Sequence, residues 1–439
     1  MRFICAGLGR IGGLAVAGVA ATLPAQTYGP TVEKPEAAAL AGVTPPAIPR
    51  ELAEAASKAV QFNPAMRAAR IGNRAAETDV KSARWLYGPS LSVNAFAFEG
   101  GSAIVRDDSF TANLVVDQPI WQGGRISGTI DRAKAAVRQS EAVTDETAQE
   151  IALRVTNIFF ELVRATLRAR TLDQGLAEHR NLVGSIERRV EQEVSPRVDL
   201  ELARSRTAQL LEQQTTANAL AASSLQQLRV LLNDTAFTLD EMPRYNPAVH
   251  HPDPAGAIEA ATTCSPARRR LQAEALVARA DQKIARAQVL PRVSAQFTSN
   301  EVTGERVGIA FSASTNGGLS QFEAARSASL RRTAAETRVG VVDLDVQTAL
   351  AADFAENSSA RDRITTSTAA AAAARAVTDS YQRQFVVSRR SWLDVMNAAL
   401  EAAQSDIAVT DAEVSAMASA ARILLRTCRW QPEPPVSRP

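Results

Sequence analysis

Aromatic residues and cysteines are scarce in this chain of 439 residues. Only 5% of its residues are aromatic, and it has three cysteines, Cys5, Cys264 and Cys428. So few cysteines exclude a disulfide-rich framework. So few aromatic residues, combined with abundant alanine, favour long and closely packed helices over a thick globular core.

The chain also lacks a strong charge of either sign and, beyond its N-terminus, any long apolar run. It has 49 Lys and Arg residues against 47 Asp and Glu residues, which argues against a nucleic-acid partner. A transmembrane helix needs about eighteen consecutive apolar residues, so none is expected. No nucleophile elbow, zinc-binding helix motif or phosphate loop occurs after the N-terminal segment, so we expect neither an enzyme nor a bound cofactor or metal.

Residues 1–25 have the features of a secretory signal peptide. A basic start leads into an apolar core and a plausible cleavage site at Leu23-Pro24-Ala25. The alternative is a dinucleotide-binding glycine pattern at residues 7–12. That pattern needs a following helix and a second strand, and the proline-rich segment 26–49 is compatible with neither. We therefore expect an exported protein.

The remaining chain repeats itself at a distance of roughly 200 residues, which makes each half one structural module. Asp79, Lys81 and Arg84 fall on Asp281, Lys283 and Arg286 without a gap. Later in each half, Val194-Ser195 matches Val387-Ser388, and Arg197 matches Arg390. The sequence thus predicts two repeats, over residues 50–239 and 257–428, with a proline-rich linker at 240–256 and a proline-rich tail at 429–439.

Each repeat reads as a helix, two strands, a very long helix, a turn and a returning helix. The long helix of the first repeat shows the four-three alternation of apolar residues that is typical of a coiled coil. The expected elements of the first repeat are strands at 90–98 and 109–118 and helices at 126–191 and 198–232. Those of the second repeat are strands at 292–299 and 306–314 and helices at 319–384 and 392–428.

The predicted strands alternate apolar and polar residues over about ten positions, as transmembrane barrel strands do. Trp85, Tyr87 and Trp121 flank them, where aromatic side chains suit a membrane interface. Ordinary hairpins of a soluble protein are the alternative. Four strands cannot close a barrel, and an open edge in lipid leaves backbone groups unsatisfied. Two copies would give a filled eight-stranded barrel, whereas three would give twelve strands and a lumen.

The order of elements, the duplication and the turn spanning residues 384–398 resemble the TolC family of outer-membrane exit ducts. The resemblance covers residues 49–426 and implies a mostly α fold in the outer membrane of a Gram-negative bacterium. It implies a homotrimer whose twelve-stranded transmembrane β-barrel continues into a long periplasmic tunnel of helices. The sequence Arg-Ser-Trp-Leu-Asp-Val at 390–395 further resembles that of the family branch that serves type I secretion of large adhesins.

The function implied by the resemblance is a tripartite export system. The duct would receive cargo from an inner-membrane ABC or RND transporter and a periplasmic adaptor protein. Small-molecule efflux is the alternative cargo. A periplasmic coiled-coil scaffold without a pore is an alternative of another class, and it would have no need of lipid-facing strands.

The resemblance also implies roles for residues at the two helix turns. Gate or constriction roles fall on Arg390, Asp394, Asn397 and Asp199, and contacts to the adaptor fall on Val194, Ser195, Arg197, Val387, Ser388 and Arg389. Asn397 stands where the family has a second acidic ring. Ser388, and Glu193 or Ser195, stand where the family has a glycine, which suggests strain in both turns. Asp199 and Asp394 also lie near helix starts, where a capping role is the alternative.

The histidines and the remaining cysteines have structural interpretations. His179 lies at a coiled-coil seam position, where packing or a polar partner is expected rather than a role as a ligand. The His250-His251 pair lacks the further ligands that a metal site needs. Cys264 and Cys428 each lie where a helix reaches the middle of the long rod, and a disulfide between them is left open.

Overall fold

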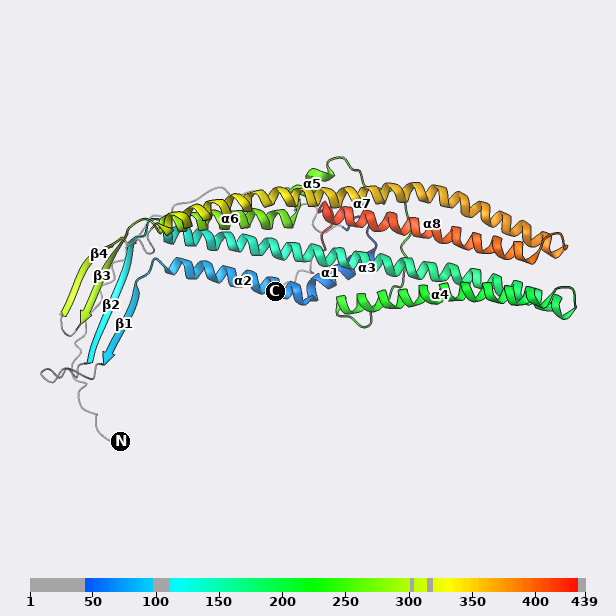
Figure 1. Ribbon diagram of the computed structural model, residues 1–439, viewed down its shortest axis with the longest axis horizontal. Helices are drawn as coiled ribbons and strands as arrows, with labels where there is room; N and C mark the ends of the chain where they lie inside the picture. The colour runs from blue at the N-terminus through cyan, green and yellow to red at the C-terminus, as the bar shows by residue number, and fades with distance from the viewer. Residues whose placement is uncertain (1–43, 98–109, 301–303, 314–318, 433–439) are drawn as a thin grey trace, which may run out of the picture. The chain divides into compact units, whose positions relative to one another are not determined.

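A computed structural model describes residues 44–97, 110–300, 304–313 and 319–432 of the chain (Figure 1). The predicted signal peptide at 1–25 lies outside these residues, as does most of the proline-rich segment 26–49. The predicted strand ends at residues 98, 109 and 314 and most of the tail 429–439 also lie outside them.

Helices dominate the described residues, and the second half repeats the order of elements of the first. The first half consists of α1 (Arg50–Phe62), α2 (Pro64–Trp85), β1 (Ser90–Ala97), β2 (Phe110–Trp121), α3 (Arg125–Glu191) and α4 (Arg197–Leu232). The second half consists of α5 (Ala257–Cys264), α6 (Pro266–Ala287), β3 (Arg292–Asn300), β4 (Gly304–Ser312), α7 (Ser320–Val386) and α8 (Trp392–Arg426).

Two helices, rather than the single expected helix, precede the strands in each half. The breaks fall at Asn63-Pro64 and Ser265-Pro266, where each proline occupies the first turn of the second helix. Proline is tolerated there because its missing N–H would have no partner inside the helix. The Asn63 side chain caps α2 by accepting a bond from the Ala65 N–H at 2.9 Å, and Ser265 Oγ accepts one from the Arg268 N–H at 3.3 Å.

Both α3 and α7 are 67 residues long, and α3 lies against five other helices, α1, α2, α4, α6 and α8. Near the strands the helices neighbour one another in the order α2, α3, α6, α7 (Figure 1). Beyond the middle, α4 and α8 take over from α2 and α6, so that α3 contacts α4 and α8, and α7 contacts α8. The helical region therefore has four helices side by side along its length, and only α3 and α7 extend from one end of it to the other.

The largest hydrophobic core lies where α1, α3, α4 and α8 meet. Phe159 and Phe160 are buried there with their rings edge to face, 5.4 Å apart. Leu52, Leu228 and Met417 pack into the same cluster from α1, α4 and α8. Seam residues of the predicted coiled coil continue the packing toward the turns in two smaller clusters, one around Leu172, Leu176 and Leu210 and one around Ile186, Ala203, Trp392 and Met396.

The four strands form one antiparallel sheet in the order β1-β2-β3-β4. The central β2–β3 pair joins the two halves of the chain. Asp117 of β2 strengthens this seam because its Oδ2 accepts bonds from Ser294 Oγ at 2.8 Å and Gln296 Nε2 at 2.7 Å. Strand β2 runs past its expected end at residue 118, and the pairing register shifts between Pro119 and Trp121.

A disulfide joins Cys264 to Cys428, which answers the question that the sequence left open. It ties the end of α5 to the residues just after α8, across a sequence separation of 164. Beside it, the buried Asp353 carboxylate of α7 accepts bonds from Arg422 at 2.6 Å and Arg426 at 2.8 Å. This part of α8 is thus held to its neighbours by covalent and ionic contacts.

Within the described ranges, no helix combines the length and the apolar character needed to cross a membrane.

Candidate functional site

One face of the sheet is mostly apolar and the other is mostly polar; the mostly apolar face also carries Gln118, Ser299 and Glu305, near its two ends. The register places Leu91 opposite Val116, Val116 opposite Phe297, and Phe297 opposite Val307. Residues paired in this way point to the same side of a sheet. Side chains alternate between the faces, so the apolar face holds Leu91, Val93, Ala95, Ala112, Leu114, Val116, Val293, Ala295, Phe297, Val307, Ile309 and Phe311.

The opposite face carries Asp117 with its partners Ser294 and Gln296, and also Ser92, Asn94, Asn113 and Arg306. On the apolar face, Val307 and Ile309 are 83% and 75% exposed. Large side chains that are this exposed on one continuous face have no partner within the described chain, so the face is built for an apolar environment.

The aromatic residues predicted for a membrane interface lie at one end of this sheet. Trp85 ends α2 and is 80% exposed, and Tyr87 lies in the connection to β1 and is 52% exposed. Trp121 ends β2 and pairs with Val293, on the apolar face. All three therefore gather where the helices give way to the strands, which is the level that an amphipathic aromatic side chain favours at a membrane boundary.

The two helix turns lie at the other end of α3 and α7. Glu191 and Val386 end the long helices, and Arg197 and Trp392 begin the returning ones. Arg197 therefore corresponds to Trp392, not to Arg390. The backbone conformations of the two turns correspond when Glu193 is aligned with Ser388. The sequence match of Val194-Ser195 with Val387-Ser388 is therefore shifted by two residues and is wrong in the turn.

Glu193 and Ser388 both adopt left-handed backbone conformations, with φ of 59° and 60°. These are the positions where the sequence lacks the expected glycine, and the geometry selects Glu193 rather than Ser195. A side chain at such an angle is less favourable than glycine. Each turn is held by backbone bonds in return, with the Val194 N–H donating to Arg189 O at 2.8 Å and the Arg389 N–H to Gln384 O at 2.8 Å.

Arg390 is tied down by three neighbours although it is exposed. Its guanidinium lies 4.5 Å from the centroid of the Tyr381 ring, and its Nε donates to Gln384 Oε1 at 3.2 Å. Its Nη1 lies 3.9 Å from Asp394 Oδ2. The stacking on Tyr381 was not foreseen from the sequence, although the spacing of nine residues across a turn could have indicated it.

The structure decides the capping question for Asp394. The cap of α8 is Ser391, whose Oγ accepts a bond from the Asp394 N–H at 3.1 Å. Asp394 and Asp199 both lie in the first turn of their helices, where a carboxylate is favoured by the helix dipole. The half-buried Asp394 and the exposed Asn397 lie one turn apart on α8.

The residues predicted to meet an adaptor form the exposed ends of these turns. Val194 and Val387 are 61% and 62% exposed. Arg197, Ser388 and Arg389 are exposed as well, and Ser195 is half-buried. Val198 and Val386 are also exposed, by 74% and 82%, so each turn presents two apolar side chains with a nearby arginine to solvent.

The histidines have structural surroundings. His179 is buried, its ring nitrogens have no hydrogen-bond partner among the described residues, and burial lowers its pKa. His251 lies between Tyr245 Oη at 2.5 Å and Asn357 Oδ1 at 2.8 Å, so both of its ring nitrogens are engaged. Over the described ranges, no group of three His, Cys, Asp or Glu residues is placed to hold a metal ion.

Comparisons with known proteins identify the fold. The chain resembles the solved structure of the outer-membrane channel OprN, with 18% identity, a TM-score of 0.76 and coverage of 87% of this chain and 91% of that one. It also resembles CusC, with 14% identity, a TM-score of 0.77 and coverage of 87% and 92%. The outer membrane protein VceC from Vibrio cholerae matches with 15% identity, a TM-score of 0.74 and coverage of 86% and 96%. At these identities the likeness shows the fold.

The family model described as outer membrane efflux protein matches residues 55–234. This match covers less than half of the chain and lies within the first repeat. Together with the shared fold, this match confirms the resemblance to TolC-family ducts, whose members are outer-membrane channels and not enzymes. A comparison with curated protein sequences found no match.

Proposed function

We propose that three copies of this chain close a twelve-stranded barrel in the outer membrane. The observation that carries the proposal is the open sheet with one mostly apolar and one mostly polar face. Strands β1 and β4 are its edges, and unpaired edges in lipid would leave their backbone groups unsatisfied. Closure of three sheets pairs β4 of one copy with β1 of the next, turns the apolar face to lipid and lines the lumen with polar residues.

The helices of the three copies then continue the wall as a periplasmic tunnel. Because the turns lie at the end of α3 and α7 away from the sheet, they form the far mouth of this tunnel. Arg390, Asp394, Asn397 and Asp199 are the proposed constriction. Carboxylates repeated around a narrow mouth favour cations over anions, and Arg390 holds the closed arrangement through Tyr381, Gln384 and Asp394.

The exposed ends of the turns are the proposed contact with the hairpins of a periplasmic adaptor. Their valine and arginine side chains offer an apolar anchor with a polar rim, which is the usual composition of a protein interface. An inner-membrane transporter of the ABC or RND type would complete the tripartite exporter.

The proposed cargo is a large secreted protein such as an adhesin. The support is the Arg-Ser-Trp-Leu-Asp-Val sequence at 390–395, which forms the turn and the first residues of α8. Efflux of small toxic compounds is the second candidate, and the description of the family favours it.

Quantitative proteomics of the medium and cell surface of a strain lacking this gene separates the two cargoes. Selective loss of one or a few very large proteins is the expected result. An unchanged secretome, together with greater sensitivity to toxic compounds, would contradict protein secretion and assign the duct to small-molecule efflux.

Conductance in planar bilayers tests the gate. Wild-type protein should stay mostly closed, whereas Arg390→Ala combined with Asp394→Ala should conduct ions, because the ties of Arg390 to the turn are lost. The control is Arg383→Ala with Glu401→Ala, which removes the same charges at exposed positions nearby. Equal conductance of wild type and the gate variant would refute the gate assignment.

A further inference from the structure

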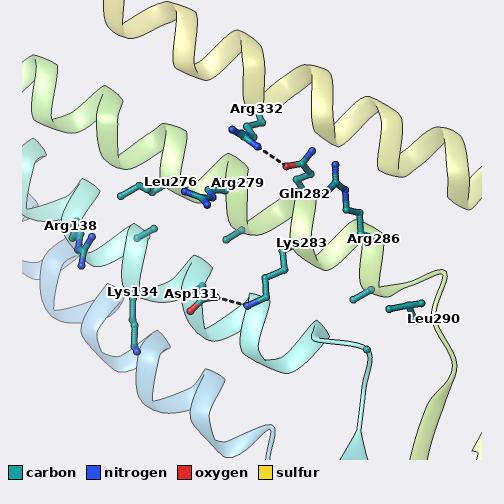
Figure 2. Close-up of a pocket in the computed structure, with 14 residues that line it drawn as sticks. Asp131, Lys134, Arg138, Leu276, Arg279, Gln282, Lys283, Arg286, Leu290 and Arg332 are labelled. Carbon is teal, nitrogen blue, oxygen red and sulfur yellow. Dashed lines mark hydrogen bonds and ion pairs between the residues drawn. The ribbon is translucent and has the colours of Figure 1, made fainter. Parts of the chain in front are cut away.

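A strongly basic pocket lies between α3 and α6, beside the junction of helices and strands. Its volume is about 640 Å³, and it is bordered by Gly123 and Leu290 at the strand end and by Arg332 of α7. Figure 2 shows charged side chains around it from α3, α6 and α7, with Lys134 extending from α3 away from α6. The lining includes six cations, Lys134, Arg138, Arg279, Lys283, Arg286 and Arg332, and one acid, Asp131.

Most of this positive charge is not neutralised within the described part of the chain. Lys283 pairs with Asp131 at 2.8 Å, and Arg332 pairs with Glu336 at 2.7 Å and donates to Gln282 at 3.3 Å. The other four cations, Lys134, Arg138, Arg279 and Arg286, have no ion-pair partner among the residues that the structure describes. The whole chain, in contrast, has a formal net charge of only +2.

The spacing of these cations disfavours the helices that carry them. Arg279, Lys283 and Arg286 follow one another at intervals of four and three residues on one face of α6, and Lys134 and Arg138 lie four residues apart on α3. Like charges at such intervals repel one another along a helix. A bound anion would remove this cost, and arginine is well suited to phosphate because its planar group donates two parallel bonds.

The duplication accounts for only part of this charge, because Lys283 and Arg286 have counterparts in Lys81 and Arg84 whereas Arg279 has no basic counterpart. Helices α2 and α6 have the same length and align without a gap, from Pro64 with Pro266 to Trp85 with Ala287. In this alignment Arg279 corresponds to Glu77. One copy of the repeat has therefore a carboxylate where the other adds a cation to the pocket.

The pocket also lies at a level where a membrane surface is expected. Gly123 is two residues beyond Trp121, where β2 ends, and Leu290 is two residues before β3 begins. If the sheet spans the outer membrane, the pocket lies at the periplasmic edge of the lipid, beside the aromatic residues of the interface. Basic pockets at such a level bind the headgroups of anionic lipids.

We infer that the pocket between α3 and α6 binds a phosphate-bearing anion, and that its source is the headgroup of an anionic phospholipid in the inner leaflet. The position of the pocket at the lipid edge rests on the proposed barrel. The recognition of phosphate rests on the cations alone. The two parts are therefore tested separately.

The first arm counts lipids on the trimer. Protein is placed in nanodiscs of phosphatidylglycerol or phosphatidylcholine, released, and weighed by native mass spectrometry. Wild type should retain phosphatidylglycerol at least five-fold more than the variant Arg279→Gln/Arg286→Gln, and should retain little phosphatidylcholine. The matched control Arg326→Gln/Arg331→Gln removes two exposed α7 arginines outside the pocket and should behave as wild type.

The second arm titrates inorganic phosphate into detergent-solubilised protein by calorimetry, and it needs neither the trimer nor a membrane. Phosphate binding that the pocket variant loses and the control keeps supports the anion site. Such binding without retained phosphatidylglycerol would overturn the lipid as the source and assign the anion to solution. Equal behaviour of wild type and the pocket variant in both arms would overturn the inference. Failure of the wild type to form a trimer would count against the proposed barrel, not against this site.

Discussion

At the scale of single residues, the buried His179 is unusual because nothing in the described chain bonds its ring. It lies on α3 between the clusters around Leu176 and Ile186, and the residue is only 1% exposed. Burial lowers its pKa from the ordinary value of 6.5. The folded protein therefore keeps this imidazole neutral at a pH where an exposed histidine takes up a proton.

This difference predicts a dependence of stability on pH. The contribution of His179 is present in full above pH 6.5 and is lost as the pH falls below that value, because only the unfolded chain then gains the proton readily. At pH 5.5, one unit below the ordinary histidine pKa, this loss of folding stability is at most about 1.4 kcal/mol. It equals the free energy that protonation gives an exposed histidine in the unfolded chain.

Denaturant unfolding of wild type and His179→Leu at pH 8.0 and 5.5 measures this contribution. Glu178, Asp411 and Glu413 have pKa values raised by burial, so they act in the opposite direction and the comparison between the two proteins is needed. The variant should lose less stability than wild type between the two pH values. Parallel losses would show that His179 does not titrate on unfolding.

The turn residues show how far single positions could be predicted from the sequence. The lack of glycine in both turns is evident from the sequence, and the strain expected at Ser388 agrees with its positive φ. The partner position in the first turn was left between Glu193 and Ser195, because the two turns share too little sequence to fix their alignment. Only the backbone conformation assigns it to Glu193.

At the scale of elements, the two faces of the sheet should respond differently to charge. Ile309 lies on the apolar face of β4, and its neighbour Gly308 lies on the polar face with open space where a side chain would extend. Arginine on the lipid side of a barrel costs about 2–4 kcal/mol near the middle of the membrane, whereas a lumen position tolerates it.

We expect Ile309→Arg to reduce the amount of folded protein in the outer-membrane fraction strongly, and Gly308→Arg to leave it near the wild-type amount. Quantitative immunoblotting of separated membranes, with resistance of the trimer to unfolding in detergent as a second reading, measures both. Equal tolerance of the two substitutions would mean that the apolar face does not meet lipid.

The disulfide between Cys264 and Cys428 is expected to stabilise the middle of the helical region. It closes a loop with a sequence separation of 164, and a disulfide of this kind contributes about 2–5 kcal/mol. Cys264→Ala with Cys428→Ala should lower the unfolding temperature. A reducing agent should lower that of wild type to a similar extent and leave the variant unchanged. An unaltered unfolding temperature in both experiments would contradict the stabilising role.

The helices and strands were largely predictable because their apolar residues recur with a clear period. The exceptions have physical reasons. The breaks before Pro64 and Pro266 were missed because proline in a first turn leaves the helical pattern on both sides intact. Strand β2 was expected to end before Pro119, which cannot donate a ladder bond, yet the chain passes it at a local register shift.

At the scale of the whole molecule, the duplicated chain gives two similar halves but not two equivalent ones. The seam β2–β3 and the contacts of α3 with α6 join the halves within one chain, while β1 and β4 remain as edges. The proposed trimer would join β4 to the β1 of a second copy. Each closed ring then alternates between a seam inside a chain and a seam between chains.

Features that depend on contacts between distant segments were not predictable. The basic pocket draws residues from α3, α6 and α7, and the ionic contacts of Asp353 with Arg422 and Arg426 connect α7 with α8. Charged residues on a long helix look alike in sequence whether they face solvent or a neighbour. Their partners become known only when the helices are placed side by side.

The number of copies in the assembled channel tests the central proposal most directly. Native mass spectrometry of protein extracted from the outer membrane, before any lipid is exchanged, gives this number. Three copies per particle are predicted, because three four-stranded sheets close a barrel with a lumen. A stable particle of one or two copies would contradict the twelve-stranded duct.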